Sequence, residues 1–218
     1  MPTITVENYL KQIILEQQKR GDQRVPMGCV AASLGVVPGT ATTMIKSLAE
    51  ARLVDYTPRK GVRLTTKGKK HALGVLRRHR IIEVFLVKIL GLNWTTIHED
   101  AERLEHAISD SVLARLDKLC GYPKYDPHGD PIPPANGEYK VQKQKNLLEC
   151  SLNKSFCIAR ILDQDTAFLK FAEKNGLVPQ AHLTVKRRDL QADAIRLETK
   201  GGKSLTLSSK VAKKILVR

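Results

Sequence analysis

The sequence has few of the features that mark secreted, disulfide-bonded or membrane proteins. Its four cysteines are scattered, and no two of them form a CxxC pair, so neither a zinc ribbon nor a disulfide framework is indicated. The most apolar run, IIEVFLVKILGLNW, is short and contains Glu83 and Lys88, which excludes a membrane-spanning helix there. The N-terminal MPTITVENYL lacks the basic-then-apolar pattern of a signal peptide. We expect a cytoplasmic protein without a membrane partner.

Recognisable catalytic motifs are also missing. The sequence contains no HExxH, no nucleophile elbow and no phosphate-binding loop. A di-metal enzyme built in a helical bundle would need a Glu-x-x-His motif on each of two helices, and His106 follows Glu105 directly, with no second such motif in the chain. We therefore expect a protein that is not an enzyme, with the di-metal enzyme as the alternative from another functional class.

Negative charge is scarce overall but concentrated in one segment. The chain has 37 Lys and Arg against 22 Asp and Glu, which gives a net charge of +15. Residues 1–80 hold 15 basic and five acidic side chains and residues 136–218 hold 17 and eight, whereas residues 81–135 hold five and nine. A strongly basic chain favours a polyanionic partner, and double-stranded DNA comes first. The acidic middle indicates a different partner for that segment.

The first 65 residues have the pattern of a winged helix-turn-helix. Apolar spacing predicts a helix over residues 5–18 and two short helices over 25–35 and 38–53, joined by a turn that contains Gly35. A hairpin with a Pro–Arg–Lys–Gly turn follows and would form the wing. The second short helix would turn its polar face to the major groove. The residues we expect to contact DNA are Gly39, Thr40, Thr42, Thr43 and Lys46 on this helix and Arg59, Lys60 and Arg63 on the wing.

The rest of the chain is predicted to hold a helical domain, a linker and a β-rich domain. Helical periodicity covers residues 66–90 and 95–119, five prolines and three glycines then interrupt it, and alternating β-branched segments follow. We expect an α+β chain, mostly helical in its N-terminal part and ending in a small β-barrel. The expected domains are a winged helix-turn-helix at 1–65, a helical dimerisation and metal-binding domain at 66–122, a Pro-rich linker at 123–140 and the barrel at 141–218.

The segment HEDAERLEH, residues 98–106, has the side chains of a metal site. On the predicted helix, its two histidines, Glu102 and Glu105 lie within an arc of about 100°. His79 and Glu83 form a further i, i+4 pair one helix earlier. Imidazole and carboxylate without thiolate suit Mn²⁺, Fe²⁺, Co²⁺ or Zn²⁺. The alternative is a set of ordinary helix histidines, with the glutamates paired to nearby Arg or Lys.

Three motifs lie behind the predicted winged helix, in the order HRIIEVFLVKILGL, HEDAERLEHAISD and PKYDPHGDPIP. Together they resemble the diphtheria toxin repressor and manganese transport regulator family of metal-dependent transcriptional repressors. The resemblance covers essentially the whole chain, including a C-terminal small barrel of the ferrous-iron-transport-protein type. It implies a homodimeric repressor of metal-uptake genes that binds operator DNA when a divalent cation is bound, Mn²⁺ first and Fe²⁺ second, with Co²⁺ or Zn²⁺ as surrogates.

The resemblance also implies metal ligands. The main regulatory site would use Glu102, Glu105 and His106 with Asn8, the second site would use His79, Glu83 and His98, and the linker and C-terminal domain would add Asp126, His128 and Asp165, with Asp163 as the competing assignment for the last. Glutamate at position 102 is typical of manganese-type members, whereas iron-type members carry cysteine there.

The first helix departs from the family pattern. Where the family has Asp or Met the chain has Asn8, and Lys11 replaces an acid that some manganese-type members carry one turn on. Asn8 keeps a neutral carbonyl oxygen, but the missing negative charge should weaken the site. Lys11 is expected to pair with Glu102 or Glu105 when no metal is bound. The alternative within the same class is a regulator that binds DNA constitutively, with a structural metal site.

Overall fold

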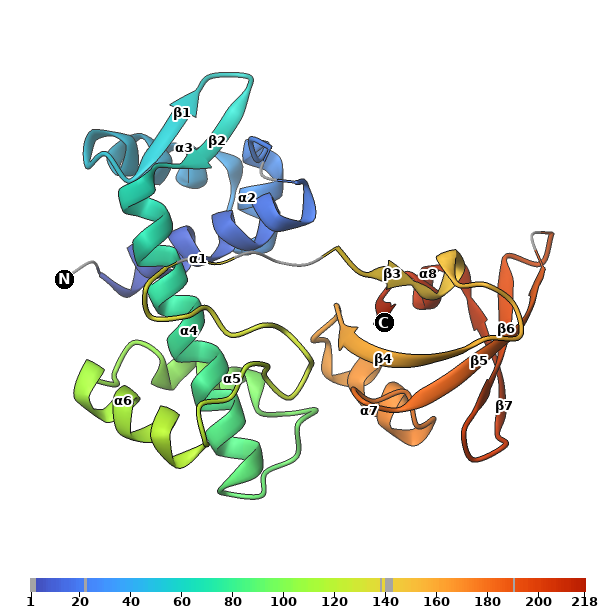
Figure 1. Ribbon diagram of the computed structural model, residues 1–218. Helices are drawn as coiled ribbons and strands as arrows, with labels where there is room; N and C mark the ends of the chain where they lie inside the picture. The colour runs from blue at the N-terminus through green and yellow to red at the C-terminus, as the bar shows by residue number, and fades with distance from the viewer. Residues whose placement is uncertain (1–2, 22, 138, 140–142, 190) are drawn as a thin grey trace. The chain divides into compact units, whose positions relative to one another are not determined.

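The computed structural model describes residues 3–21, 23–137, 139, 143–189 and 191–218, and they divide into two compact units. Unit 1 comprises Met1–His79, Glu105–Ile108 and Pro133–Val141, and unit 2 comprises Arg80–Leu104, Ser109–Ile132 and Gln142–Arg218. The division falls inside one continuous helix, α4 (Thr66–Lys88) (Figure 1). Each unit has its own hydrophobic core.

Unit 1 is a helix-turn-helix followed by a hairpin. Its helices before α4 are α1 (Ile4–Lys19), α2 (Met27–Ser33) and α3 (Pro38–Glu50), and its strands are β1 (Val54–Thr57) and β2 (Gly61–Leu64). Pro38 opens α3, where a missing backbone N–H costs nothing. Among the described residues no single helix is long and apolar enough to cross a membrane; α2 and α3 meet that length and composition only as a pair, which is bent by 106°.

The hairpin is fastened to the segment before α2. The strands β1 and β2 pair antiparallel, with Val54 opposite Leu64, and Val25 forms an isolated bridge with Val62. Gly61 has a φ of +100°, and a Cβ there would lie 2.3 Å from the Val25 carbonyl oxygen. Only glycine allows this close approach, so the wing is fixed to the unit 1 core close to its turn.

The helical part of unit 2 holds the end of α4 together with α5 (His98–Leu104) and α6 (Asp110–Leu119). The prediction of one helix from 95 to 119 is wrong, because the helix stops at Leu104 and restarts at Asp110. Ser109 caps the restart, since its Oγ accepts a hydrogen bond from the Val112 N–H at 3.3 Å. His98 and Glu102 therefore share a helix face, but Glu105 and His106 lie beyond the helix end.

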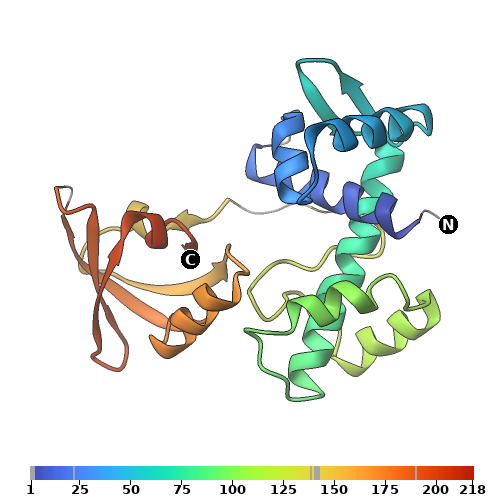
Figure 2. The same cartoon turned by 180° about the vertical axis from the view of Figure 1, so that it is seen from behind.

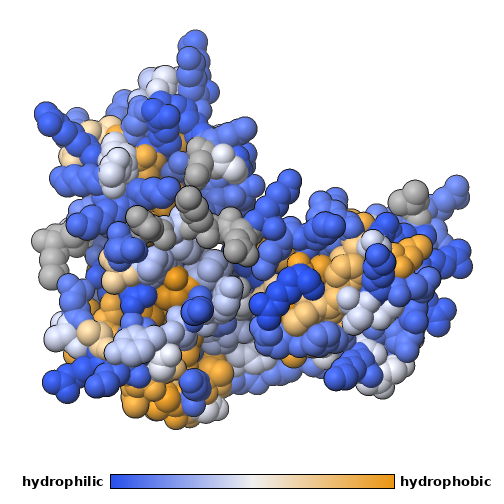
Figure 3. Space-filling view, in the orientation of Figure 1, coloured by the Kyte–Doolittle hydropathy of each residue, from blue (hydrophilic) through white to orange (hydrophobic). Residues whose placement is uncertain are grey.

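Apolar side chains of this helical part remain at the surface. The large exposed ones are Ile89, Leu90, Leu92, Leu104, Val112 and Leu119. Figure 3 shows hydrophobic surface gathered over this region. An exposed apolar patch on a water-facing domain marks an interaction surface.

The C-terminal part of unit 2 is a sheet domain. In chain order its elements are β3 (Lys145–Asn146), the 3₁₀ turn η1 (Leu147–Glu149), β4 (Ser155–Ile161), α7 (Thr166–Lys174), β5 (His182–Asp189), β6 (Ala194–Thr199), β7 (Ser204–Ser208), α8 (Ser209–Ala212) and β8 (Ile215–Val217). The antiparallel order is β3-β8-β4-β5-β6-β7. Leu169 and Ala172 of α7 belong to the buried core of this sheet, which both views show from opposite sides (Figure 1, Figure 2). The chain is thus α+β, with a helical N-terminal region and a C-terminal sheet that is open among the described strands.

The linker before the sheet docks on β4 within unit 2. Gly129 has a φ of +87°, and a Cβ there would lie 2.0 Å from the Ala159 carbonyl oxygen. The Ile161 N–H donates to the His128 carbonyl oxygen at 2.9 Å. These contacts hold residues 126–130 in a defined loop rather than a free linker.

Candidate functional site

The helix α3 presents the polar face that was expected to contact DNA. Gly39, Thr40, Thr43 and Lys46 are exposed and Thr42 is half-buried, while Ala41, Ile45 and Leu48 are buried in the unit 1 core. The Thr42 and Thr43 hydroxyls donate to the carbonyl oxygens of Pro38 and Gly39, at 2.8 and 3.1 Å. Their hydrogens are therefore engaged by the helix itself, and each threonine offers its methyl group and oxygen lone pairs to a partner.

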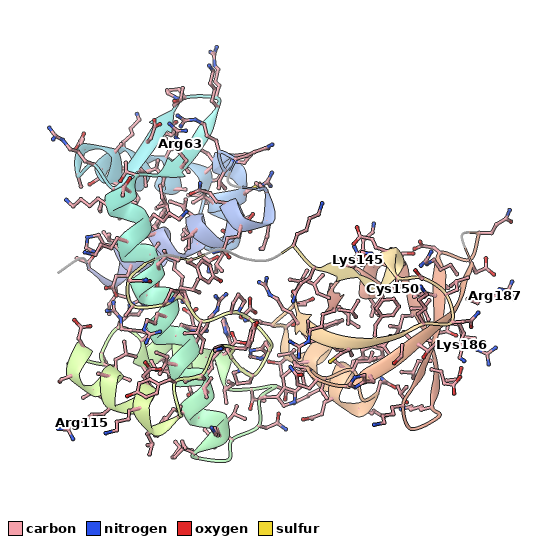
Figure 4. All side chains as sticks on the ribbon, viewed as in Figure 1. Arg63, Arg115, Lys145, Cys150, Lys186 and Arg187 are labelled. Carbon is pink, nitrogen blue, oxygen red and sulfur yellow. The ribbon has the colours of Figure 1, made fainter. Side chains whose placement is uncertain are left out.

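The wing carries three basic side chains with different restraints. Arg59 and Lys60 are exposed in the turn. Arg63 lies on β2 (Figure 4), and its Nε donates to Asp55 Oδ2 at 2.9 Å. The Arg24 Nη2 donates to the same oxygen at 2.7 Å. The hydrogen bond from Arg24 lowers the pKa of Asp55 more than burial raises it. The hydrogen bond from Arg63 adds to this effect, so the pKa lies below its usual range. Arg63 is therefore oriented by Asp55, whereas the two turn residues are not.

A first buried cluster joins α1 to the turn after α5, within unit 1. We call it the first-helix cluster; its members are Glu7, Asn8, Lys11, His79, Glu105 and His106. At its centre Glu105 is fully buried, and its two oxygens have different partners. The Lys11 Nζ donates to Oε1 at 2.6 Å, and the His79 Nδ1 donates to Oε2 at 2.6 Å. The expected pairing of Lys11 with an acid is confirmed, and the acid is Glu105.

His106 makes the second half of the first-helix cluster. Its Nδ1 lies 2.5 Å from Glu7 Oε2, and its Nε2 lies 2.8 Å from Asn8 Oδ1. The other Glu7 oxygen accepts from the Arg78 Nη2 at 2.9 Å. Each carboxylate of the cluster thus has a cationic side chain of this chain beside it. This arrangement does not favour a divalent ion at Glu105, because the Lys11 ammonium already occupies one of its oxygens.

A second buried cluster lies within unit 2. We call it the linker cluster; it consists of Glu83 on α4 with Asp126 and His128 of the linker, all buried. One potential ligand atom from each residue lies within 4.8 Å of those from the other two. His128 Nδ1 and Glu83 Oε2 are 3.7 Å apart. On the far side of the ring, the His128 Nε2 donates to the Trp94 carbonyl oxygen at 3.0 Å. That hydrogen bond turns Nδ1 toward the carboxylates, as in a metal-binding histidine.

Asp126 is held in place by backbone donors. Its Oδ1 accepts from the backbone N–H groups of His128 and Asp130, at 2.9 and 2.8 Å. Its Oδ2 and the His128 Nδ1 are buried without a hydrogen-bond partner, and such atoms are costly unless a ligand satisfies them. Arg80 Nε approaches Oδ2 only to 3.4 Å. Two carboxylates and one imidazole, with orphaned acceptor atoms, fit a divalent cation such as Mn²⁺ or Fe²⁺.

The electrostatics of the linker cluster indicate too much negative charge. Burial and the nearby charges of Asp130 and Glu83 raise the pKa of Asp126 to about 7. Burial lowers the pKa of His128, but the nearby Glu83 carboxylate, together with Asp126 and Asp130, outweighs this effect and raises the value to about 9. Both shifts mean that the site attracts positive charge, from protons or from a cation.

Asp130 and its two arginine partners were not predicted from the sequence. Asp130 accepts from the Arg80 Nη2 at 3.0 Å and forms an ion pair with Arg160 of β4. The two arginines neutralise Asp130 and leave the linker cluster as the acidic pocket. The spacing of the second acid in YDPHGD was the available hint, but its partners lie 50 and 30 residues away.

The remaining predicted ligands have other contacts. His98 Nδ1 lies 3.4 Å from Glu83 Oε1, and His98 Nε2 lies 3.7 Å from Glu102 Oε1. The Asp165 Oδ1 caps α7 by accepting from the Phe168 N–H at 2.9 Å. Asp163 accepts from the Asp165 N–H at 3.0 Å and pairs with Lys214. His98 thus adjoins the linker cluster, whereas Asp163 and Asp165 serve local structure around α7.

A winged helix-turn-helix joined to a helical domain with a carboxylate–imidazole cluster defines the class of metal-regulated DNA-binding proteins. Residues 1–62 match the iron dependent repressor N-terminal DNA binding domain, residues 65–134 its metal binding and dimerisation domain, and residues 145–218 the FeoA domain. The chain belongs to the diphtheria toxin repressor and manganese transport regulator family of metal-dependent transcriptional repressors.

Individual relatives agree with this assignment. The chain is 35% identical over 126 residues to the HTH-type transcriptional regulator MntR of Oceanobacillus iheyensis, covering 58% of this chain and 84% of that protein. A manganese-dependent transcriptional repressor in complex with manganese has 36% identity and a TM-score of 0.87, covering 97% of this chain and 98% of that one. The structure of ScaR with bound Zn²⁺ has 34% identity and a TM-score of 0.81, covering 100% and 99%. These relatives are regulators, so the chain is a DNA-binding regulator rather than an enzyme.

Proposed function

We propose that this chain is a homodimeric repressor of metal-uptake genes, activated by a divalent cation held in the linker cluster. The observation that carries the proposal is the buried grouping of Glu83, Asp126 and His128, in which Asp126 Oδ2 and His128 Nδ1 have no hydrogen-bond partner. The same chain begins with a DNA-binding domain. A cation site and an operator-binding unit in one chain support a repressor that responds to metal concentration.

The proposed ion is Mn²⁺, with Fe²⁺ second and Co²⁺ or Zn²⁺ as surrogates. Two carboxylates and one imidazole without thiolate favour hard or borderline cations. The similar structures described with manganese and with zinc support the same order. When bound, the ion supplies positive charge to a pocket in which burial and neighbouring acids disfavour the ionised Asp126.

The other ligands predicted from the sequence have unequal support. His98 adjoins Glu83, and His79 precedes Glu83 by one turn of α4, so both stay proposed as neighbours of the linker cluster. Asp165 stays a prediction, as do Glu102, Glu105, His106 and Asn8. The hydrogen bond of Lys11 to Glu105 argues against a metal site at these four residues.

The proposed response uses α4 as the connecting element. This helix begins directly after the wing and carries Glu83 in its last turns. Asp126 and His128 attach the linker to α4 by way of Glu83, and charge neutralisation there would stabilise one position of the helix relative to the linker. A cation that favours the DNA-competent position raises operator affinity, and operator raises cation affinity by the same factor.

Operator contacts are proposed for Gly39, Thr40, Thr42, Thr43 and Lys46 on α3 and for Arg59, Lys60 and Arg63 on the wing. The basic side chains would meet phosphates and the α3 face would enter the major groove. The homodimer surface is proposed to consist of the exposed apolar residues that follow α4 and those of α5 and α6, namely Ile89, Leu90, Leu92, Leu104, Val112 and Leu119. We further propose a cytoplasmic location, and closure of the open C-terminal sheet into a small barrel.

The test is a titration of labelled operator, selected from random duplexes in the presence of Mn²⁺, with and without the ion at fixed ionic strength. We expect Mn²⁺ to lower the apparent Kd by about tenfold or more, within the usual range of such couplings. His128→Ala should remove this response, whereas His71→Ala, a histidine of α4 outside both clusters, should keep it. Equal Kd values with and without metal would leave DNA binding and reject metal activation.

A constitutive DNA-binding regulator is the second candidate, and one observation favours it. The buried contact of Lys11 with Glu105 ties α1 to the turn after α5 without any metal. On this alternative all four divalent ions leave operator affinity unchanged.

A further inference from the structure

Lys11 is placed in the interior of unit 1 rather than on the surface of α1. Its side chain is 3% exposed and that of Glu105 is fully buried, and the two are 94 residues apart in sequence. Lysine is almost never fully buried unless it is paired. A buried ammonium at 2.6 Å from a buried carboxylate is therefore a built feature of the core and not an incidental surface contact.

The charge of this region is balanced by the chain itself. Glu105 lies between Lys11 and His79, and Glu7 lies between Arg78 and His106. Placing a divalent ion on Glu105 would bring it within about 5 Å of the Lys11 ammonium, where like charges repel strongly in a buried setting. Expelling Lys11 instead would require α1 to release a side chain that its own core position holds. A divalent ion at Glu105 would therefore have to displace the ion pair with Lys11.

We propose that Lys11 is the permanent counter-ion of Glu105, that it ties α1 to the Glu105–Ile108 turn in place of a metal, and that, of the two clusters, only the linker cluster takes a divalent cation. The last clause rests on the proposed function, whereas the first two stand on the contacts of unit 1 alone. The first helix is then held in place at all metal concentrations. Metal binding to one protomer has one class of site and follows a single saturation curve.

The experiment counts bound Mn²⁺ per protomer by equilibrium dialysis of the full chain, with the free ion followed by electron paramagnetic resonance. Wild type is expected to bind one ion and His128→Ala none. Glu105→Gln should still bind one, because Glu105 is not a ligand. Lys11→Glu, which replaces the ammonium by a carboxylate, should open a second site and bind two. Lys19→Met on the exposed face of α1 is the matched control and should bind one.

The outcomes separate the inference from the proposed function. Two ions in wild type and one in Glu105→Gln would overturn the inference and leave a metal-activated repressor intact. No ion in wild type but one in Lys11→Glu would support the role of Lys11 and reject the linker cluster as a site. An unchanged count in a folded Lys11→Glu variant would also overturn the inference. If that variant does not fold, the comparison of wild type with Glu105→Gln decides.

Discussion

The two buried clusters contain the same kinds of side chain but differ in how their charges are paired. In the first-helix cluster Glu105 has Lys11 and His79 at 2.6 Å on its two oxygens. In the linker cluster His128 Nδ1 stays 3.7 Å from Glu83 Oε2, and Asp126 Oδ2 has no hydrogen-bond partner. One cluster is closed by a cation that belongs to the chain, and the other is suited to a cation from outside.

On the proposed assignment, the ligand pattern alone does not make a metal site. The motif HEDAERLEH contains the acids and histidines that a site needs, yet a single lysine from α1 satisfies its central carboxylate. The shorter motif YDPHGD places two side chains whose charges are left incompletely compensated. Lys11 is hydrogen-bonded to Glu105, whereas Arg80 approaches Asp126 Oδ2 only to 3.4 Å. This difference supports the linker cluster as the proposed metal site.

The largest expected effect comes from removing Lys11 from the first-helix cluster. Lys11→Met should lower the free energy of unfolding by about 3–5 kcal/mol, because it leaves a buried carboxylate without its main counter-ion. The measurement is urea denaturation of the full chain in EDTA, so that metal binding does not contribute. The double variant Lys11→Met with Glu105→Leu should recover most of the loss, since a packed apolar pair can replace a buried ion pair. A Lys11→Met variant as stable as wild type would contradict the role of Lys11 as the main counter-ion of Glu105.

The second effect comes from removing His128 from the linker cluster. His128→Ala should weaken Mn²⁺ binding by about 100-fold, or about 2.7 kcal/mol, because it removes one of the three proposed protein ligands. Its stability in EDTA should fall much less than that of Lys11→Met. The measurement is isothermal titration calorimetry with Mn²⁺, with His71→Ala as the matched control. Unchanged affinity in His128→Ala would place the metal elsewhere.

The third effect is a dependence of metal binding on pH. The pKa of His128 is raised to about 9, so below that value a proton competes for Nδ1. Mn²⁺ affinity should therefore rise about tenfold per pH unit between 7 and 9 and level off above 9. Below pH 7 protonation of Asp126, whose pKa is raised to about 7, should steepen the loss. Affinity that is constant from pH 7 to 9 would contradict the linker cluster as the site.

The local parts of the fold could be read from the sequence. Apolar spacing predicted α1, α3 and α4, and the turn and hairpin signals predicted the wing, because these elements are set by neighbouring residues. The break between α5 and α6 was missed because the apolar period continues through it. Ser109 followed by Asp110 is a helix-start signal that outweighed the period.

The site was predictable in its residue types but not in its partners. His79 and Glu83 stand out from their i, i+4 spacing, which does not depend on the rest of the fold, whereas His128 was implied by the family resemblance. The engagement of Glu105 depends on packing between α1 and a turn 94 residues later, which no local pattern encodes. The same holds for Arg160 of β4, whose ion pair neutralises Asp130. Long-range charge partners therefore decide the chemistry of both clusters.

The smallest expected effect tests whether Asp165 is a metal ligand of the linker cluster. Its Oδ1 accepts from the Phe168 N–H at 2.9 Å as the N-cap of α7, so Asp165→Ala should lower the free energy of unfolding by about 1 kcal/mol. As a cap it should leave Mn²⁺ affinity unchanged, and Asp165→Ser, which can also cap, should restore stability. As a ligand it would lose affinity in both variants, since serine does not replace a carboxylate. Denaturation in EDTA and calorimetry with Mn²⁺ on the same two variants separate the roles, and a loss of affinity shared by both would extend the linker cluster to α7.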